Sequence, residues 1–155
     1  MSSPKANTFS IREYQPADFP TLCTLDRLCF PEGIAYPAEE MALGLEQHGA
    51  FALVAEISGQ VVGFILAHRR GRQWGHIITI DVHPQFQHQG LGARLMELAE
   101  QRLSKSGAIR LLLEVWVENR IAIQFYEKRG YAVRQVLSNY YRDGSDAYLM
   151  EKNLA

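Results

Sequence analysis

The sequence predicts an α/β sandwich built on one mixed sheet. Three observations predict it: consecutive β-type runs between residues 50 and 83, a change to helical periodicity at Gly90, and an apolar run at 109–117 between two helical patterns. The 155 residues can close one hydrophobic core but are too few for two substantial domains. We therefore expect one domain at residues 8–155, preceded by a flexible or disordered N-terminus at residues 1–7.

The first fifty residues predict one strand and two helices. Residues 9–14 suggest the strand, and from residue 16 to residue 29 apolar side chains recur every three or four positions, as in a helix. Two prolines and a glycine interrupt the pattern at 30–37, so this segment is expected to be a loop with exposed aromatic side chains. A short helix is expected at 38–47.

The remaining elements follow from changes in the apolar pattern. Apolar and β-branched residues dominate 50–57, 61–69 and 74–83, and Ser58-Gly59 is a typical hairpin turn, so three antiparallel strands are expected. The run at 109–117 is apolar on both faces except at Glu114 and, near its start, Arg110, which is typical of a central strand. The sequence also predicts helices at 90–106 and 119–130 and final strands at 131–138 and 146–152.

Composition excludes several classes of protein. Hydrophobic residues make up 47% of the chain, and a net charge of -1 gives no basic surface for nonspecific nucleic-acid binding. The two cysteines, Cys23 and Cys29, lack the spacing of a zinc site, and the five histidines form no HxxxH or HxH pair, so no metal site is expected. No secretory signal or membrane span is apparent. We expect a cytoplasmic monomer or homodimer without nucleic-acid or membrane partners.

The most informative stretch is 81–100, where a strand ends and a helix begins within a turn that contains Gly90 and Gly92. Glycines let backbone N–H groups approach a ligand, and the helix N-terminus adds partial positive charge, so the turn predicts a phosphate site. A P-loop is excluded because no Lys-Ser or Lys-Thr follows, and a dinucleotide loop because Leu95 stands where a third small residue is needed. Taken alone, the two glycines are also compatible with a tight strand-to-helix turn that binds no phosphate.

The string Gln87-His88-Gln89-Gly90-Leu91-Gly92 matches a Q/R-x-x-G-x-G/A pattern, and the chain resembles the GCN5-related N-acetyltransferase (GNAT) family. VHPQFQ, LEVWVEN, IQFYEKRGY and NYYRDGSDAYLME, in this order, resemble the ribosomal-protein-alanine N-acetyltransferases (the RimI group) and related protein N-terminal acetyltransferases. The resemblance covers most of the chain from about residue 50. It implies a GNAT-type fold, a mixed and mostly antiparallel seven-stranded sheet flanked by about four helices, and acetyl-CoA as co-substrate without a metal.

The resemblance also implies the residues of the cofactor site. The end of a splayed and bulged strand would polarise the thioester carbonyl through its backbone, and the following loop would hold the pyrophosphate. These residues are Ile80, Asp81 and Val82 on the strand, His88, Gln89, Gly90, Leu91, Gly92 and Ala93 in the loop, and Asn119 at the later helix. His88 and Gln89 depart from the arginines often found in the family, so weaker and somewhat pH-dependent cofactor binding is expected.

Acetyl transfer to an amine needs a neutral amine, a polarised carbonyl and a proton for the leaving thiolate. Glu114 is the only acidic residue of its strand, and it matches the catalytic glutamate of the related enzymes, so we expect it to be the general base, directly or through water. A salt-bridged glutamate is the alternative. Tyr126 lies seven residues after Asn119 on the same helix face and matches the tyrosine that protonates the thiolate. A core tyrosine is the alternative there.

The acceptor side is expected to be formed by two aromatic loops rather than by bulk charge. The resemblance implies that Tyr140 and Tyr141 hydrogen-bond the substrate's backbone, with Tyr36 opposite them. The expected activity is acetyl transfer, by direct attack, to the α-amine of a protein N-terminus. An acceptor that is a small amine, such as an amino acid, a polyamine or an antibiotic, is the alternative, and a non-catalytic acyl-CoA-binding module is a weaker one.

Overall fold

The computed structural model describes residues 8–154, so the segment expected to be flexible at residues 1–7 lies outside the described residues. The N-terminal elements are β1 (Ser10–Glu13), η1 (Pro16–Asp18), α1 (Phe19–Cys29), α2 (Ala38–Glu46), β2 (Phe51–Ile57), β3 (Gln60–Arg70) and β4 (Trp74–Val82). They are followed by η2 (Pro84–Phe86), α3 (Leu91–Lys105), β5 (Arg110–Trp116), α4 (Arg120–Lys128), β6 (Ala132–Leu137) and β7 (Ala147–Asn153). The expected strands and helices are therefore confirmed, with ends that differ by about two residues or less.

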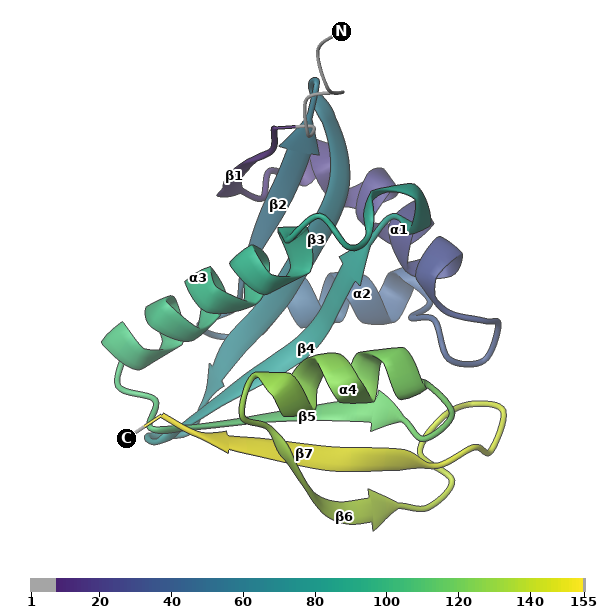
Figure 1. Cartoon of the computed structure of the whole chain (residues 1–155), viewed down its shortest axis with the longest axis vertical. Coiled ribbons are helices and arrows are strands. Elements are labelled where there is room, and N and C mark those ends of the chain that lie inside the picture. Colours follow the sequence, from purple (N-terminus) through teal and green to yellow (C-terminus); the bar gives the residue numbers. More distant parts are fainter. Residues whose placement is uncertain (1–7, 155) are drawn as a thin grey trace, which may run out of the picture.

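One seven-stranded sheet in the order β1-β2-β3-β4-β5-β7-β6 organises the fold. Its pairs are antiparallel except for β4 and β5, which are parallel, so the mixed and mostly antiparallel sheet is confirmed. The parallel pair is short: only Trp74–His76 pairs, with Arg110–Leu112. Beyond it the two strands diverge, as Figure 1 shows, and the sheet opens into a V.

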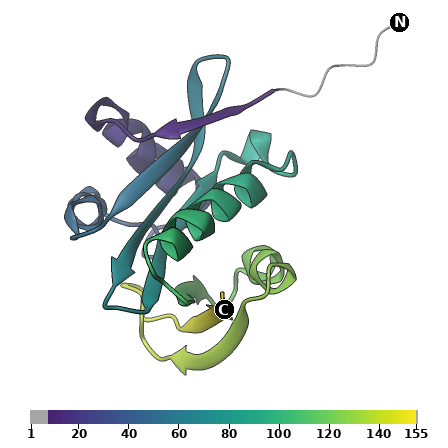
Figure 2. The same ribbon diagram turned by 90° about the vertical axis from the view of Figure 1, so that its left-hand side faces the viewer.

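Helices cover both faces of the sheet (Figure 2). Strand β2 shows why, because its side chains alternate between two cores. Leu53 and Ala55 join the core beneath α3, whereas Ala52 and Val54 join the core beneath α1 and α2. Helix α4 covers the other limb of the V, over β5 and β7 (Figure 1).

A bulge in β4 changes which way its side chains face. Leu66 pairs with Thr79 and Ala67 pairs with Ile77, so Ile78 is the extra residue. The bulge that the resemblance implied at 80–82 therefore lies earlier in the strand.

Downstream of the bulge, the side chains of β4 alternate between the two faces of the sheet. Ile80 and Val82 pack against the core beneath α3. Asp81 instead contacts Asp26 of α1, on the opposite face.

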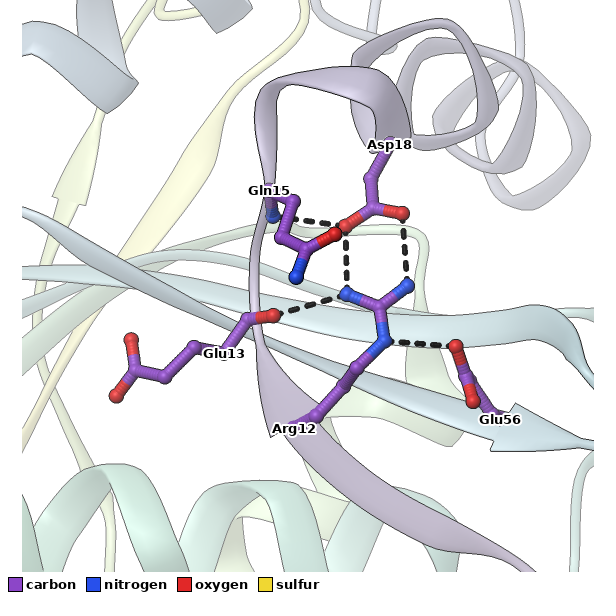
Figure 3. Close-up of polar contacts among 5 residues, drawn as sticks. All are labelled: Arg12, Glu13, Gln15, Asp18 and Glu56. Atoms are coloured by element: carbon purple, nitrogen blue, oxygen red, sulfur yellow. Dashed lines mark hydrogen bonds and ion pairs between the residues drawn. The ribbon is translucent and has the colours of Figure 1, made fainter.

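A charged cluster fixes the corner between β1 and α1 (Figure 3). The Arg12 guanidinium donates to both carboxylate oxygens of Asp18, at 2.8 and 2.9 Å, and its Nε donates to Glu56 of β2 at 2.7 Å. Asp18 also accepts from the Gln15 N–H at 2.8 Å. This corner sets where α1 begins, and α1 leads directly into the 30–37 loop.

Candidate active site

A cleft of about 810 Å³ fills the opening between β4 and β5. Its walls come from the diverging ends of both strands, parts of the turn at 84–93, one face of α4, and residues between Leu28 and Tyr36. The short parallel ladder at the vertex of the V therefore creates the cavity. Side chains far apart in the sequence meet there.

The turn before α3 presents a row of backbone donors to this cleft. His88 and Gly90 have φ values of 64° and 88°, left-handed conformations that turn successive N–H groups toward one side. The first helical bond runs from the Arg94 N–H to the Gly90 carbonyl, at 3.1 Å. The N–H groups of 91–93 precede it and have no intrahelical acceptor, so they are available to an anion.

Gly92 keeps the space beside this turn open. A Cβ at this position would lie 3.5 Å from the Phe125 ring of α4 and 3.7 Å from Val82. A larger side chain would fill the gap between α3 and α4. The glycine therefore leaves room for a ligand between the two helices, in addition to exposing its N–H.

Most of the residues expected to hold the cofactor line the cleft. They are Ile80, Asp81, Val82, His88, Gly90, Leu91, Gly92, Ala93 and Asn119. Gln89 is exposed and does not line the cleft. Asn119 uses its Oδ1 to accept the Ala122 N–H at 3.2 Å and so caps α4, which leaves its amide NH₂ free to donate.

Glu114 lies in the cleft at one end of a three-residue polar chain, with His76 in the middle and His68 at the other end. His76 Nε2 is 2.7 Å from Glu114 Oε2, and His68 Nε2 is 3.3 Å from His76 Nδ1. The Glu114 and His76 side chains are only 11% and 14% exposed. Burial, followed by the nearby charges of His76 and Arg70, lowers the pKa of His68, so this ring is neutral at pH 7. Glu114 is thus paired with a ring nitrogen instead of the permanent cation of an arginine.

Tyr126 projects from α4 into the same cleft. Burial, and then the nearby Asp81, raises the pKa of its hydroxyl, so the group stays protonated. The ring is held edge-on against Phe125, with centroids 5.5 Å apart. Within residues 8–154 no side chain or backbone group hydrogen-bonds the hydroxyl, so its proton is available to a ligand.

The three tyrosines that were expected to bind the acceptor differ in whether they line the cleft. Tyr36 and Tyr141 line the cleft, whereas Tyr140 is 43% exposed, does not line it and stacks edge-on against Tyr141 at 4.9 Å. The expectation of exposed aromatic residues in the 30–37 loop is wrong, because Phe30 and Tyr36 are both half-buried. The Tyr36 hydroxyl donates to the Ile78 carbonyl at the bulge, at 3.3 Å.

The two aromatic loops contact each other. The Arg142 N–H donates to the Gly33 carbonyl at 3.2 Å, and the Arg142 guanidinium pairs with Glu40 at 2.6 Å. Gly33, with φ of 91°, lies so close to Asp143 that a Cβ would come within 2.9 Å of the Asp143 Cβ. The loops therefore form one continuous wall on the acceptor side.

Several residues of the site were not identified from the sequence. His68 and His76 are eight residues apart, but they are directly opposite in the β3–β4 register. A hairpin whose turn lies at 71–73 would have predicted that pairing. Lys128 and Arg129, at the end of α4, also line the cleft, and Arg129 lies 3.8 Å over the Phe125 ring.

In residues 8–154 no three or more His, Cys, Asp or Glu side chains are grouped so as to hold a metal ion. Over the same range no helix has the length and apolar character needed to cross a membrane.

Comparison with known proteins identifies the family of the chain. The acetyltransferase (GNAT) family matches residues 18–131, further toward the N-terminus than the resemblance had reached. An N-alpha-acetyltransferase from Sulfurisphaera tokodaii is 32% identical over 161 residues, covering 94% of this chain and 93% of the relative. Ard1 from Thermoplasma volcanium superposes with a TM-score of 0.86 at 28% identity, covering 95% of this chain and 98% of that one.

The ribosomal-protein-S18-alanine N-acetyltransferase from Escherichia coli has the same fold, with a TM-score of 0.82 at 24% identity over 96% of this chain and 95% of that one. The family match covers well over half of the sequence, and it agrees with the splayed sheet and the glycine turn described above. The chain belongs to the acetyltransferase (GNAT) family.

Proposed function

We propose that this protein transfers the acetyl group of acetyl-CoA to the α-amine of protein N-termini. One observation carries the proposal: a single cleft holds a backbone anion site at one end and the Glu114–His76 pair with Tyr126 further in. The Sulfurisphaera tokodaii relative, which matches nearly the whole chain, is named N-alpha-acetyltransferase. Both the chemistry of the site and the relative support the same reaction.

The cofactor end of the cleft combines backbone donors with two cations. The N–H groups at 88–93 would hold the pyrophosphate, as helix N-termini do for other phosphates. Lys128 and Arg129 line the same cleft, and their charge offsets the absence of arginines at His88 and Gln89. The end of β4, at 80–82, would orient the thioester through its backbone.

The reacting end supplies a base and an acid. Glu114, together with His76, would take one proton from the substrate ammonium, and the neutral nitrogen would then attack the thioester carbonyl carbon. As the C–N bond forms and the C–S bond breaks, the thiolate leaves with the bonding pair. Tyr126 would donate its hydroxyl proton to that sulfur. Its raised pKa keeps the proton on the oxygen until the thiolate forms.

The acceptor wall favours a peptide end over a small amine. Tyr36 and Tyr141 line the cleft from two loops that are joined through Arg142 and Gly33. Their rings and hydroxyls offer both apolar contact and hydrogen bonds to a backbone that continues out of the cleft. A small amine would leave most of this wall unused.

Mass spectrometry after incubation with acetyl-CoA tests the function. The acceptors are an equimolar mixture of peptides with free N-termini, the same peptides with blocked N-termini and an internal lysine, and small amines including amino acids, polyamines and an aminoglycoside. We expect acetylation of the free N-termini. Acetylation of only the small amines would support the alternative acceptor, and tight acetyl-CoA binding with no acetylated product would support a non-catalytic module.

A further inference from the structure

Two buried aspartates on different elements contact each other beside the cleft. Asp26 of α1 is 0% exposed and Asp81 of β4 is 1% exposed. Asp26 Oδ2 accepts the Tyr36 N–H at 2.6 Å, and Asp81 Oδ1 accepts the Thr79 hydroxyl at 2.7 Å. The remaining oxygens, Asp26 Oδ1 and Asp81 Oδ2, are buried and have no donor among the residues that the structure describes.

Two carboxylates in contact inside a protein cannot both be ionised, because their repulsion is not screened by water. A single shared proton removes the repulsion and also satisfies both unpartnered oxygens. Burial raises the pKa of both groups, and for Asp81 the hydrogen bond with Asp26 and its charge raise it further, well above the usual range. The shared proton therefore lies mainly on Asp81, while Asp26 is left ionised to accept the Tyr36 N–H.

The surrounding groups supply no buried cation that would replace this proton. From α1, the Cys29 thiol has its pKa raised to about 12 by burial and then by Asp81, so it is neutral. Tyr126 from α4 and Tyr36 from the loop are neutral phenols, and Thr79 adds only a hydroxyl. Among residues 8–154, Arg27 is the one cation that acts on Asp26, and its side chain is exposed.

We propose that Asp26 and Asp81 are positioning residues that share one proton and thereby hold Tyr36 against β4. The proposal rests on the proposed function for its effect on the acceptor. Tyr36 is held at two points, by its N–H on Asp26 and by its hydroxyl on the Ile78 carbonyl. Loss of the shared proton at alkaline pH leaves two buried carboxylates that repel, and the 30–37 loop moves away from the strand. Acceptor binding then weakens while acetyl-CoA binding is retained.

Asp26→Asn keeps the hydrogen bonds to Tyr36 and Asp81 but removes the need for a shared proton. The new amide can accept the Tyr36 N–H through its oxygen and donate through its NH₂ to an ionised Asp81, so the contacts persist at every pH. The matched control is Glu32→Gln, which removes an exposed carboxylate from the same loop. Asp26→Leu removes both hydrogen bonds, and we expect it to raise the acceptor KM about ten-fold at all pH values.

Three measurements decide the proposal. Hydrogen exchange with mass spectrometry gives the protection factor of the 30–37 segment, which we expect to fall with rising pH in the wild type and in Glu32→Gln but to stay constant in Asp26→Asn. Steady-state kinetics give the acceptor KM, which should follow the same pattern, with kcat changing equally in all three proteins. Infrared spectroscopy should detect a protonated buried carboxyl in the wild type that Asp26→Asn lacks.

A protection factor with the same pH dependence in the wild type and in Asp26→Asn overturns the proposal, as does the absence of the protonated carboxyl. Because exchange and infrared measurements need no substrate, they test the proton-sharing pair even if no N-terminus is acetylated. Failure of the proposed function and failure of this inference are therefore distinguishable.

Discussion

The two limbs of the V contribute different things to one cleft. The β4 limb is covered on both faces, and what it offers a ligand is mostly backbone: the strand end at 80–82 and the N–H groups at 88–93. The β5 limb is less enclosed, since β6 is exposed over most of its length, and it offers side chains such as Glu114, Tyr126 and Tyr141. The difference indicates that binding of the cofactor and the chemistry of transfer can be altered separately by mutation.

The largest effect is expected on the β5 limb, at Glu114. Glu114→Gln should lower kcat about a hundred- to a thousand-fold at neutral pH, because the amide cannot accept the ammonium proton. The loss should shrink at alkaline pH, where an α-amine with a pKa of about 8 is already neutral. A pH profile of kcat checks this, with Glu118→Gln, an exposed neighbour beyond the strand end, as the control. An unchanged rate and profile would remove Glu114 from the mechanism.

Tyr126→Phe should have the next largest effect. Without the hydroxyl proton the thiolate is a poorer leaving group, and kcat should fall about a hundred-fold. The ring and its packing against Phe125 remain, so the Kd for acetyl-CoA measured by calorimetry should stay the same. Full activity of the variant would refute the assignment of Tyr126 as the acid.

On the β4 limb we expect a change in affinity instead of rate. Gly92→Val should raise the Kd for acetyl-CoA about ten-fold, because its side chain fills the gap before Phe125, and should leave kcat at saturation nearly unchanged. Gly92→Ala is the matched control, since its Cβ meets only ordinary contacts. If Gly92→Val lowered kcat as strongly as Tyr126→Phe, the separation between the two limbs would be wrong.

The smallest effect is expected at His68 of β3, which reaches Glu114 of the β5 limb only through His76 of β4. His68→Gln replaces the ring that hydrogen-bonds His76 Nδ1, so it should lower kcat about three-fold at neutral pH. Burial lowers the pKa of His68, so its ring gains a proton only in acid, and removing that titration should make the acid limb of the pH profile shallower. His48→Gln, at an exposed histidine, should change neither quantity.

Local patterns in the sequence were enough for the elements and for much of the cleft. The glycine turn, the apolar strand around Glu114 and the helix from Asn119 to Tyr126 are each set by neighbours within a few residues. The sequence pattern could not place the bulge at Ile78, because a bulge depends on the register with the partner strand. Nor could it pair Asp26 with Asp81, which meet only after α1 packs on the sheet.

Two of the expected site residues, Gln89 and Tyr140, do not line the cleft themselves, although each lies next to residues that do. Adjacent residues in a turn can face opposite directions, and no periodicity of the sequence reports which one faces inward. A motif therefore locates a binding loop more reliably than it locates each side chain in that loop.

The short β4–β5 ladder also bears on how the chain folds. Strands β1–β4 come from one continuous stretch, 10–82, and strands β5–β7 from another, 110–153, so all strand pairing except three residue pairs joins neighbours within one stretch. Each stretch therefore contains its own strand pairs, and the two stretches are joined by α3 and by the short β4–β5 ladder. The catalytic cavity exists only when the two stretches are docked, so a ligand that touches both halves slows their separation and raises the thermal unfolding midpoint by mass action.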